Sequence, residues 1–272
     1  MDLATVKLQP MATTAGPLAG RRIVVTRARD QAADLVRALE ARGAVVTALP
    51  VIEIVPLPDL SALRAALYAI RDYQWVVFTS QNAVQVVCDR LEEWGLAPAP
   101  FSSARVGAIG PATAAALGER GIRVDLVPEG FIAESLVEAL KERGGLAGAR
   151  VLVPRAETAR DALPDGLRAL GARVDVIPVY RTVGAAGDGG AAAGDLLARR
   201  VDVVTFTSSS TVRHFVQLVG NDAARAPFLA AVIGPVTAET ARSYGMNVAI
   251  AADEYTVPGL VSAIERHFAG GR

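Results

Sequence analysis

The chain has little of what structural cross-links and metal sites are made of. Its 272 residues contain one cysteine, Cys88, so an internal disulfide is excluded. There are only two histidines, His214 and His267, and with Cys88 they cannot complete a closed structural zinc site without carboxylate help. We interpret Cys88 as a small core residue and both histidines as ordinary helix positions, so no metal centre is expected.

The chain also lacks an excess of charge and a long hydrophobic run. Lysine plus arginine number 28, as do aspartate plus glutamate, whereas nucleic-acid binders usually carry a basic excess. No segment offers the roughly 20 uninterrupted apolar residues of a membrane span, and residues 1–17 do not resemble a secretory signal. We therefore expect a cytoplasmic protein with neither nucleic acid nor membrane as a partner.

Motifs of common nucleotide and hydrolytic sites are absent as well. The turn after the first predicted strand, residues 26–30, contains no glycine, which argues against close approach of a dinucleotide pyrophosphate. The sequence has no Walker A loop, no His-Glu-x-x-His and no nucleophile elbow. No catalytic triad or cofactor site is therefore expected.

What the chain does have is an internal repeat. Four short segments return in the same order 128 residues later, or 124 after a small deletion. The matched pairs are 20–28 with 148–156, Pro50-Val51 with Pro178-Val179, 78–80 with 206–208, and 109–113 with 233–237. Two similar domains joined by linkers form a cleft, and such clefts often bind ligands.

Hydrophobic patterns predict strands that alternate with helices in both copies. Strands are predicted at 22–26, 44–49, 75–78, 105–109 and 124–127, and again near 150–154, 173–177, 201–206, 229–233 and 247–251. Helices are predicted in between, the first with Asp30 as its N-cap. This alternation is typical of α/β folds with parallel sheets. The Gly- and Ala-rich segment 184–194 is interpreted as a flexible connector.

Four strand-to-helix turns carry small hydroxyl residues. Free backbone N–H groups and the helix dipole favour an anion where a strand leads into a helix. Ordinary N-capping explains any single turn, but four turns in two matched pairs favour a site for carboxylates or phosphates. Two arginines at equivalent positions after the first strand of each copy would add charge-assisted bonds. The candidate ligand-binding residues are Thr79, Ser80, Gly110, Thr113, Ser208, Ser209, Gly234, Thr237, Arg27 and Arg155.

In these segments the chain resembles the uroporphyrinogen-III synthase family, over roughly residues 18–268. The markers of the first half are 25–27, Pro50-Val51-Ile52-Glu53, 78–84 and 109–113. The markers of the second half are 153–155, Val179-Tyr180-Arg181-Thr182, 206–209 and 233–237. Each block alone has little specificity, whereas the full set in this order is fairly specific.

The resemblance implies a cofactor-independent lyase of tetrapyrrole (heme) biosynthesis. Its substrate would be hydroxymethylbilane, a linear tetrapyrrole carrying several carboxylates. The enzyme would expel the terminal hydroxyl as water and close the ring to uroporphyrinogen III, with the last ring inverted through a spiro intermediate. Such an enzyme mainly positions a reactive chain, which fits the missing catalytic motifs. The resemblance also implies a monomer that receives its substrate from hydroxymethylbilane synthase.

The resemblance assigns roles to a few residues. Tyr180 would assist loss of the hydroxyl as a hydrogen-bond donor or weak acid, against the alternative of an interfacial aromatic residue with a polar tip. Thr113 and Thr237 match threonines that line the family's cleft, and Ser80 and Ser208 match the serines after the strand. Glu134 is given no catalytic role, because the matched segment 255–259 has no acidic residue there.

The resemblance also changes the expected domain boundaries. The repeat alone suggests halves at 20–147 and 148–272. In this family the chain crosses between domains twice, which implies one domain of 18–49 plus 181–272 and another of 52–178. The hinge would then lie near 50–51 and 178–180. The fold expected is two similar flavodoxin-like or Rossmann-like three-layer domains, with residues 1–17 as a disordered extension.

Two other functions remain open at this point. One is a non-catalytic, two-domain clamp that binds an acidic tetrapyrrole or another polycarboxylate, with a regulatory role. The other is a nucleotide-dependent enzyme of Rossmann type, which the glycine-free first turn disfavours.

Overall fold

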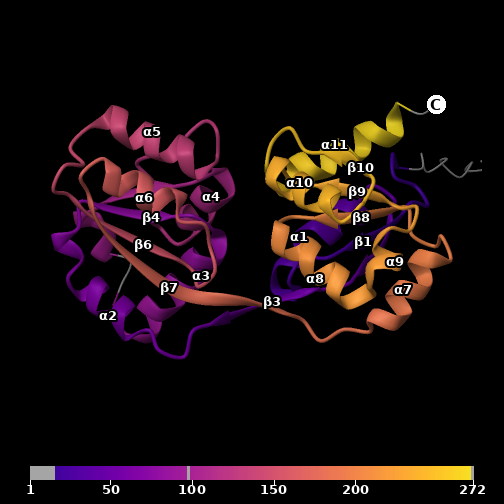
Figure 1. Ribbon diagram of the computed structural model, residues 1–272, viewed down its shortest axis with the longest axis horizontal. Helices are drawn as coiled ribbons and strands as arrows, with labels where there is room; N and C mark the ends of the chain where they lie inside the picture. Colours follow the sequence, from indigo (N-terminus) through magenta and orange to yellow (C-terminus); the bar gives the residue numbers. More distant parts are fainter. Residues whose placement is uncertain (1–15, 97–98, 271–272) are drawn as a thin grey trace, which may run out of the picture. The chain divides into compact units, whose positions relative to one another are not determined.

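The computed structural model describes residues 16–96 and 99–270. The chain forms two compact units, the first with Asp188–Asp253, Val257 onward and the described residues up to Leu49, and the second with Pro50–Gly187 and Glu254–Thr256. In Figure 1 the indigo and yellow ends of the chain accordingly lie in one unit and the magenta middle in the other. Each unit therefore combines parts of both sequence repeats. Of the segment 1–17, which was predicted to be disordered, residues 1–15 lie outside the described residues.

The first unit is built on a parallel sheet with the strand order β10-β9-β8-β1-β2. Its strands are β1 (Arg22–Val25), β2 (Val45–Ala48), β8 (Val203–Phe206), β9 (Leu229–Val232) and β10 (Val248–Ala251). All neighbouring pairs are parallel. The inner strands β1, β8 and β9 are short apolar runs and almost wholly buried, as expected for strands covered on both faces.

Helices cover both faces of this sheet. They are α1 (Arg29–Glu40), α7 (Gly189–Leu197), α8 (Ser209–Val219), α9 (Asn221–Ala224), α10 (Pro235–Ser243) and α11 (Val257–Ala269). On one face, Leu35 of α1 and Leu260 of α11 share a core with Ile23. On the other, the ring of Phe215 in α8 lies edge-on to Phe206 of β8, with centroids 5.2 Å apart. The unit is thus a three-layer α/β/α domain.

The second unit has a mixed sheet with the strand order β3-β7-β6-β4-β5. Its strands are β3 (Ile52–Pro56), β4 (Trp75–Phe78), β5 (Arg105–Ala108), β6 (Arg150–Ala156) and β7 (Arg173–Gly184). β4, β5, β6 and β7 pair in parallel. β3 pairs antiparallel with the end of β7, so the prediction of parallel sheets is confirmed except at this edge.

The helices of the second unit also form two layers. They are α2 (Ser61–Tyr68), α3 (Gln81–Glu93), α4 (Pro111–Glu119), α5 (Ala133–Arg143) and α6 (Ala162–Ala169), with 3-10 turns at Ile70–Asp72 and Ala99–Ser103. Val76 and Phe78 face a core with residues of α2, α3 and α4. Trp75 and Val77, which alternate with them along β4, face α5 and α6.

The two units have the same strand order once the repeat is taken into account. β1, β2, β8 and β9 of the first unit correspond in sequence to β6, β7, β4 and β5 of the second. Each sheet then has the flavodoxin-like order 2-1-3-4, and β10 supplies the fifth strand in the first unit. The flavodoxin-like prediction is therefore confirmed, but each sheet takes two of these strands from one repeat and two from the other.

Three local predictions need correction, and one strand was missed. The predicted strand 124–127 is reduced to one bridge between Leu126 and Gly107. β3 was not predicted, because it follows Pro50 and itself ends with Pro56, and proline within a sheet is tolerated mainly in edge strands such as this one. The N-cap of α1 is Ala28, and Asp30 lies in the first turn. Residues 189–194, expected to be part of a flexible connector, open α7, whose N-cap Asp188 accepts a bond from the Ala191 amide at 3.0 Å.

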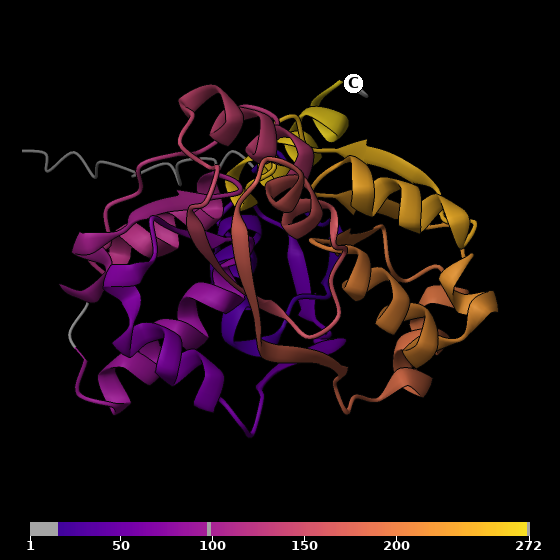
Figure 2. The ribbon, with the colours of Figure 1, turned by 60° about the vertical axis from the view of Figure 1, so that its left-hand side comes forward.

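The boundary after β7 also differs from the expected one. The segment 178–180, predicted as a hinge, lies inside β7, which pairs there with both β6 and β3. The chain leaves the second unit only after Gly187, so residues 181–187 belong to that unit and not to the first. The continuous ribbon of β7 can be followed in Figure 2. A hydrogen-bonded strand restricts φ and ψ, which makes its free end a better place for a change of direction.

Candidate functional site

Tyr180 and Ser80, 100 residues apart in sequence, meet in the second unit. Tyr180 lies on β7, opposite Pro56 of β3. Ser80 follows β4 and caps α3, where its Oγ accepts a hydrogen bond from the Ala83 amide at 3.1 Å. The Ser80 Oγ and the phenol oxygen of Tyr180 lie 3.0 Å apart. A hydrogen-bonded chain thus runs from the N-terminus of α3 through Ser80 to Tyr180.

Burial sets the protonation state of Tyr180. The residue is 5% exposed, and burial raises the pKa of its phenol, although hydrogen bonds with Ser80 and Asn82 act in the opposite direction. The phenol is therefore neutral at physiological pH. With the Ser80 hydroxyl donating to its oxygen, Tyr180 keeps its own O–H to donate elsewhere.

The second candidate turn of this unit is tied to the first. Gly110 is the N-cap of α4 with extended backbone, and Pro111 occupies the first helical position. Thr113 lies two residues further on and is 5% exposed. The Gln81 side-chain amide donates to the Ala112 carbonyl at 3.2 Å, which joins the first turns of α3 and α4.

In the first unit, Ser208 caps α8 with a reciprocal pair of bonds. The Thr211 amide donates to the Ser208 Oγ at 3.2 Å, and the Ser208 amide donates to the Thr211 Oγ1 at 3.3 Å. The Ser208 Oγ also lies 2.9 Å from the Ser210 Oγ. This capping box makes the start of α8 a well-defined cluster of hydroxyl groups.

The hydroxyl group of Ser209 makes two hydrogen bonds to other residues of the protein. It donates to the Val236 carbonyl at 3.3 Å, and the Thr240 Oγ1 donates to it at 2.8 Å. Val236 lies in the first turn of α10, after the N-cap Gly234 and before Thr237, which is 5% exposed. Since its one proton is used, Ser209 cannot donate to a carboxylate while this bond is kept.

The two candidate arginines differ in their surroundings. Arg155 was placed after the strand but lies inside β6, where Asp161 accepts from its guanidinium at 2.8 Å and the Arg160 carbonyl at 3.1 Å. Its side chain is 12% exposed. Arg27 follows β1 and donates to the Gln31 side chain at 3.4 Å; burial lowers its pKa.

In each unit, the candidate residues lie at the carboxyl ends of the strands. The strand order reverses between β1 and β8 in the first unit and between β6 and β4 in the second. Ligands of such sheets bind at this switch point, beyond the carboxyl ends of the strands. Arg27 and Ser208 lie there in the first unit, and Arg155, Thr79 and Ser80 in the second.

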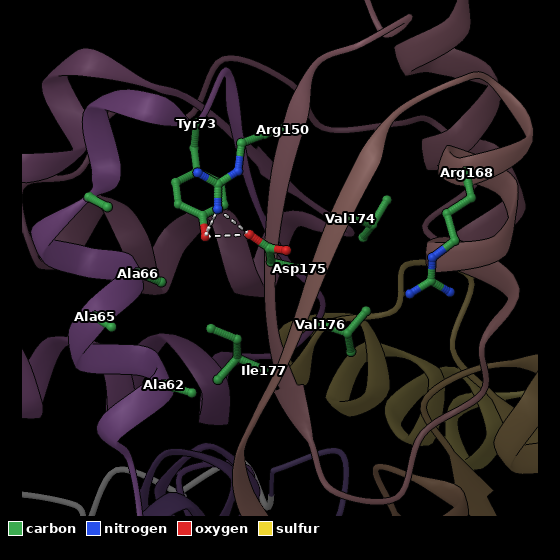
Figure 3. A pocket seen from close by; sticks show the side chains of 11 residues that line it. Ala62, Ala65, Ala66, Tyr73, Arg150, Arg168, Val174, Asp175, Val176 and Ile177 are labelled. Carbon is green, nitrogen blue, oxygen red and sulfur yellow. Dashed lines mark hydrogen bonds and ion pairs between the residues drawn. The ribbon is translucent and has the colours of Figure 1, made fainter.

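The sequence did not reveal a polar cluster at the opposite, amino end of the second sheet. Tyr73 donates to the Asp175 carboxylate at 2.5 Å, and Arg150 bonds the same oxygen at 2.7 Å. Burial, followed by the bond to Asp175, raises the pKa of Tyr73 to about 12. Figure 3 shows the three side chains at one end of a cavity of about 620 Å³, with Ala62 and Ala65 of α2 along its wall. No motif marks these residues, which come together only by folding.

The remaining expectations concern metals, the cysteine and membranes. Within residues 16–96 and 99–270, no group of three His, Cys, Asp or Glu side chains could hold a metal ion. Cys88 is buried, and burial raises the pKa of its thiol to about 11. Among the described helices, none is long and apolar enough to cross a membrane.

Comparison with known proteins gives consistent matches along most of the chain. Residues 33–262 match the family described as "Uroporphyrinogen-III synthase HemD". The chain is 36% identical to the uroporphyrinogen-III synthase of Synechococcus elongatus, over 92% of this chain and 96% of that protein. It is 34% identical to a putative uroporphyrinogen-III synthase of Methanothermobacter thermautotrophicus, over 89% of this chain and 96% of that protein.

Solved structures show the same fold. A mutant uroporphyrinogen-III synthase from Thermus thermophilus superimposes with a TM-score of 0.62 at 20% identity, covering 92% of this chain and all of that one. The synthase of Helicobacter pylori gives a TM-score of 0.56 at 17% identity, over 91% of this chain and 99% of that one. With a family match over most of its length and relatives above 30% identity, the chain belongs to the uroporphyrinogen-III synthase family.

Proposed function

We propose that the protein is a lyase that cyclises hydroxymethylbilane to uroporphyrinogen III without a cofactor. The observation that carries the proposal is the 36% identity to a uroporphyrinogen-III synthase, which extends over nearly the whole of both chains. The geometry supports it, because both units present helix N-termini after their strands, with Ser80 and Ser208 capping α3 and α8 and with glycine at the starts of α4 and α10.

The reaction breaks one C–O bond and one C–C bond and forms two new C–C bonds. The C–O bond to the terminal hydroxyl breaks, the oxygen takes up a donated proton and leaves as water, and the terminal pyrrole gives up its N–H proton to become an azafulvene. The substituted carbon of the last ring then bonds to the azafulvene carbon and forms a spiro intermediate. The old bond from the methylene bridge to that carbon then breaks, the bridge bonds to the unsubstituted α carbon on the other side of the same ring's nitrogen, and loss of the proton there closes the macrocycle with the ring inverted.

Tyr180 would assist the first step. A neutral phenol can donate a hydrogen bond to the departing hydroxyl and stabilise the developing negative charge on that oxygen. Ser80 would support it, because a proton donated from Ser80 to the Tyr180 oxygen leaves the phenol proton available to substrate. The backbone amide that binds Ser80 fixes this arrangement.

The remaining candidate residues would hold the carboxylates. Acceptor-only carboxylates match the positive ends of the helix dipoles and the N–H groups at the starts of α3, α4, α8 and α10. Thr79, Thr113, Ser208 and Thr237 would add hydroxyl donors, Gly110 and Gly234 would allow close approach to the backbone, and Arg27 and Arg155 would add charge. Positioning of this kind can supply much of the rate for a substrate that closes without help.

The proposal extends to partners. The protein would act as a monomer on hydroxymethylbilane delivered by hydroxymethylbilane synthase. Sedimentation of the purified chain at several concentrations tests the first point.

The test is an isomer assay. Hydroxymethylbilane is generated in the reaction mixture, and purified protein is added. One protein sample is used directly and a second after dialysis against a chelator. The products are oxidised, and the type I and type III uroporphyrins are separated. We expect an excess of the type III isomer over the protein-free control and the same excess after dialysis. A product equal to the control would contradict the synthase function, and loss of the excess on dialysis would contradict cofactor independence alone.

A further inference from the structure

In each unit, the two helices of the candidate site are tied together at their first turns. In the second unit the tie is the Gln81 amide, which bonds the Ala112 carbonyl at 3.2 Å. In the first unit it is the Ser209 hydroxyl, which bonds the Val236 carbonyl at 3.3 Å. Gln81 and Ser209 are equivalent in the repeat, as are Ala112 and Val236. The same contact has therefore been kept with two different side chains.

A second pair of positions explains how a short serine replaces a long glutamine. Thr240 donates to the Ser209 Oγ at 2.8 Å and also lies 2.9 Å from the Val236 carbonyl oxygen. The equivalent of Thr240 in the second unit is Ala116. Glutamine with alanine in one unit thus matches serine with threonine in the other. The compensation indicates that the tie itself is required, because neither side chain alone is preserved.

We propose that Gln81 and the Ser209–Thr240 pair are positioning residues that fix the spacing of the paired helix N-termini. The inference rests on the proposed function, in which those first turns bind substrate carboxylates. It reassigns Ser209, which the sequence suggested as a direct ligand, because its proton is already donated to Val236. Through Ala112 and Val236 the ties hold the turns that carry Thr113 and Thr237.

Loss of a tie has a distinctive kinetic consequence. The turns that bind carboxylates shift relative to each other, while Tyr180 and its bond to Ser80 are untouched. We therefore expect KM to rise about three- to tenfold, the factor that corresponds to one neutral hydrogen bond, with a smaller change in kcat. A loosely held substrate also closes outside the enforced geometry, so the type I fraction should increase.

The experiment compares each tie with a neighbour on the same helix. Gln81→Ala is paired with Gln85→Ala, which removes an exposed glutamine of α3. Thr240→Val keeps the side-chain shape and is paired with Ser243→Ala, which removes an exposed hydroxyl of α10 bonded to the Thr240 carbonyl. KM, kcat and the isomer ratio are measured for all four, together with the melting temperature. Gln81→Ala and Thr240→Val should raise KM and the type I fraction. Gln85→Ala and Ser243→Ala should leave both at wild-type values.

A double variant that moves the Ser209–Thr240 pair into the second unit gives the most direct test. Gln81→Ser alone should behave like Gln81→Ala, whereas Gln81→Ser with Ala116→Thr rebuilds in the second unit the pair found in the first. Recovery of KM and of the type III fraction in the double variant would support positioning, which a general loss of stability does not predict.

The outcomes separate this inference from the proposed function. If the wild-type protein forms type III and the variants Gln81→Ala and Thr240→Val equal it in KM and isomer ratio, the inference is overturned and the proposed function stands. A double variant no better than Gln81→Ser would overturn it as well. A wild-type protein that yields no type III excess would contradict the function and remove the inference with it.

Discussion

At the scale of single residues, the proposed chemistry centres on the buried phenol of Tyr180. Its hydroxyl is at the end of a chain that starts at a backbone amide, and burial keeps it neutral. A raised pKa means that the protonated form persists to higher pH than for a free tyrosine, so the donor is present throughout the physiological range.

We predict that Tyr180→Phe lowers kcat by about tenfold or more and changes KM little, because the donor is needed only as the hydroxyl leaves. Steady-state kinetics on freshly generated hydroxymethylbilane measure both. Tyr73→Phe is the matched control, since it removes a phenol bonded to Asp175 at the other end of the sheet. An effect of Tyr180→Phe on KM alone, or an equal loss of kcat in both variants, would contradict the role.

The buried threonines give a second prediction at this scale. Replacing Thr113 and Thr237 together by alanine should weaken binding of the product by about 30-fold, because one ordinary hydrogen bond of about 1 kcal/mol is lost at each position. Fluorescence titration with uroporphyrin III measures the affinity, and Thr47→Ala, at an exposed position of β2, is the control. Unchanged affinity in the double variant would remove both residues from the site.

At the scale of elements, the capping box of Ser208 determines how firmly α8 begins. Ser208→Ala should lower the free energy of unfolding by about 1 kcal/mol, because the Thr211 amide loses its acceptor, while the bond from the amide of residue 208 to the Thr211 Oγ1 remains. Urea denaturation measures the change, and Ser208→Thr, which keeps a capping oxygen, should recover most of it. Equal stability of the alanine variant and the wild type would show that the cap contributes nothing.

The pairing of β1 with β8 predicts a dependence of stability on pH. Asp202 accepts bonds from the side chain and the backbone amide of Arg22, and chiefly the side-chain bond lowers the pKa of its carboxyl. A lowered pKa in the folded state gives stability that is present above the unfolded pKa and is lost as pH falls through the folded one. Asp202→Asn should therefore reduce stability at pH 7 and flatten its fall between about pH 5 and pH 2.

Thermal melts across this range are the measurement, with Asp195→Asn as an exposed comparison on α7. A parallel acid limb in the Asp202→Asn and wild-type proteins would mean that this ion pair does not govern acid sensitivity.

Most elements could be read from the sequence because their patterns are local. The strand at Trp75–Phe78 was predicted at its exact bounds, since a four-residue apolar run ends at the capped start of α3. β3 could not be predicted, because its pairing with Arg181 and Thr182 depends on residues far along the chain. Residues 189–194 were misassigned because glycine and alanine suggest a flexible linker until the Asp188 cap is seen.

At the scale of the whole molecule, the repeat explains why candidate residues occur twice, although it does not reveal that each sheet combines strands of both copies. The equivalence of Arg27 with Arg155 and of Ser80 with Ser208 could be predicted from the sequence, because the repeat aligns these positions. The Tyr180–Ser80 contact and the Tyr73–Asp175–Arg150 cluster were not, because they arise only when distant strands become neighbours.

The most direct test of the account is the type III fraction as a function of protein concentration, at a fixed supply of hydroxymethylbilane. The account predicts that the fraction rises from the protein-free value toward near-complete type III, and that the rise shifts to higher concentration in Tyr180→Phe. A fraction that stays at the protein-free value at every concentration of folded protein would contradict it.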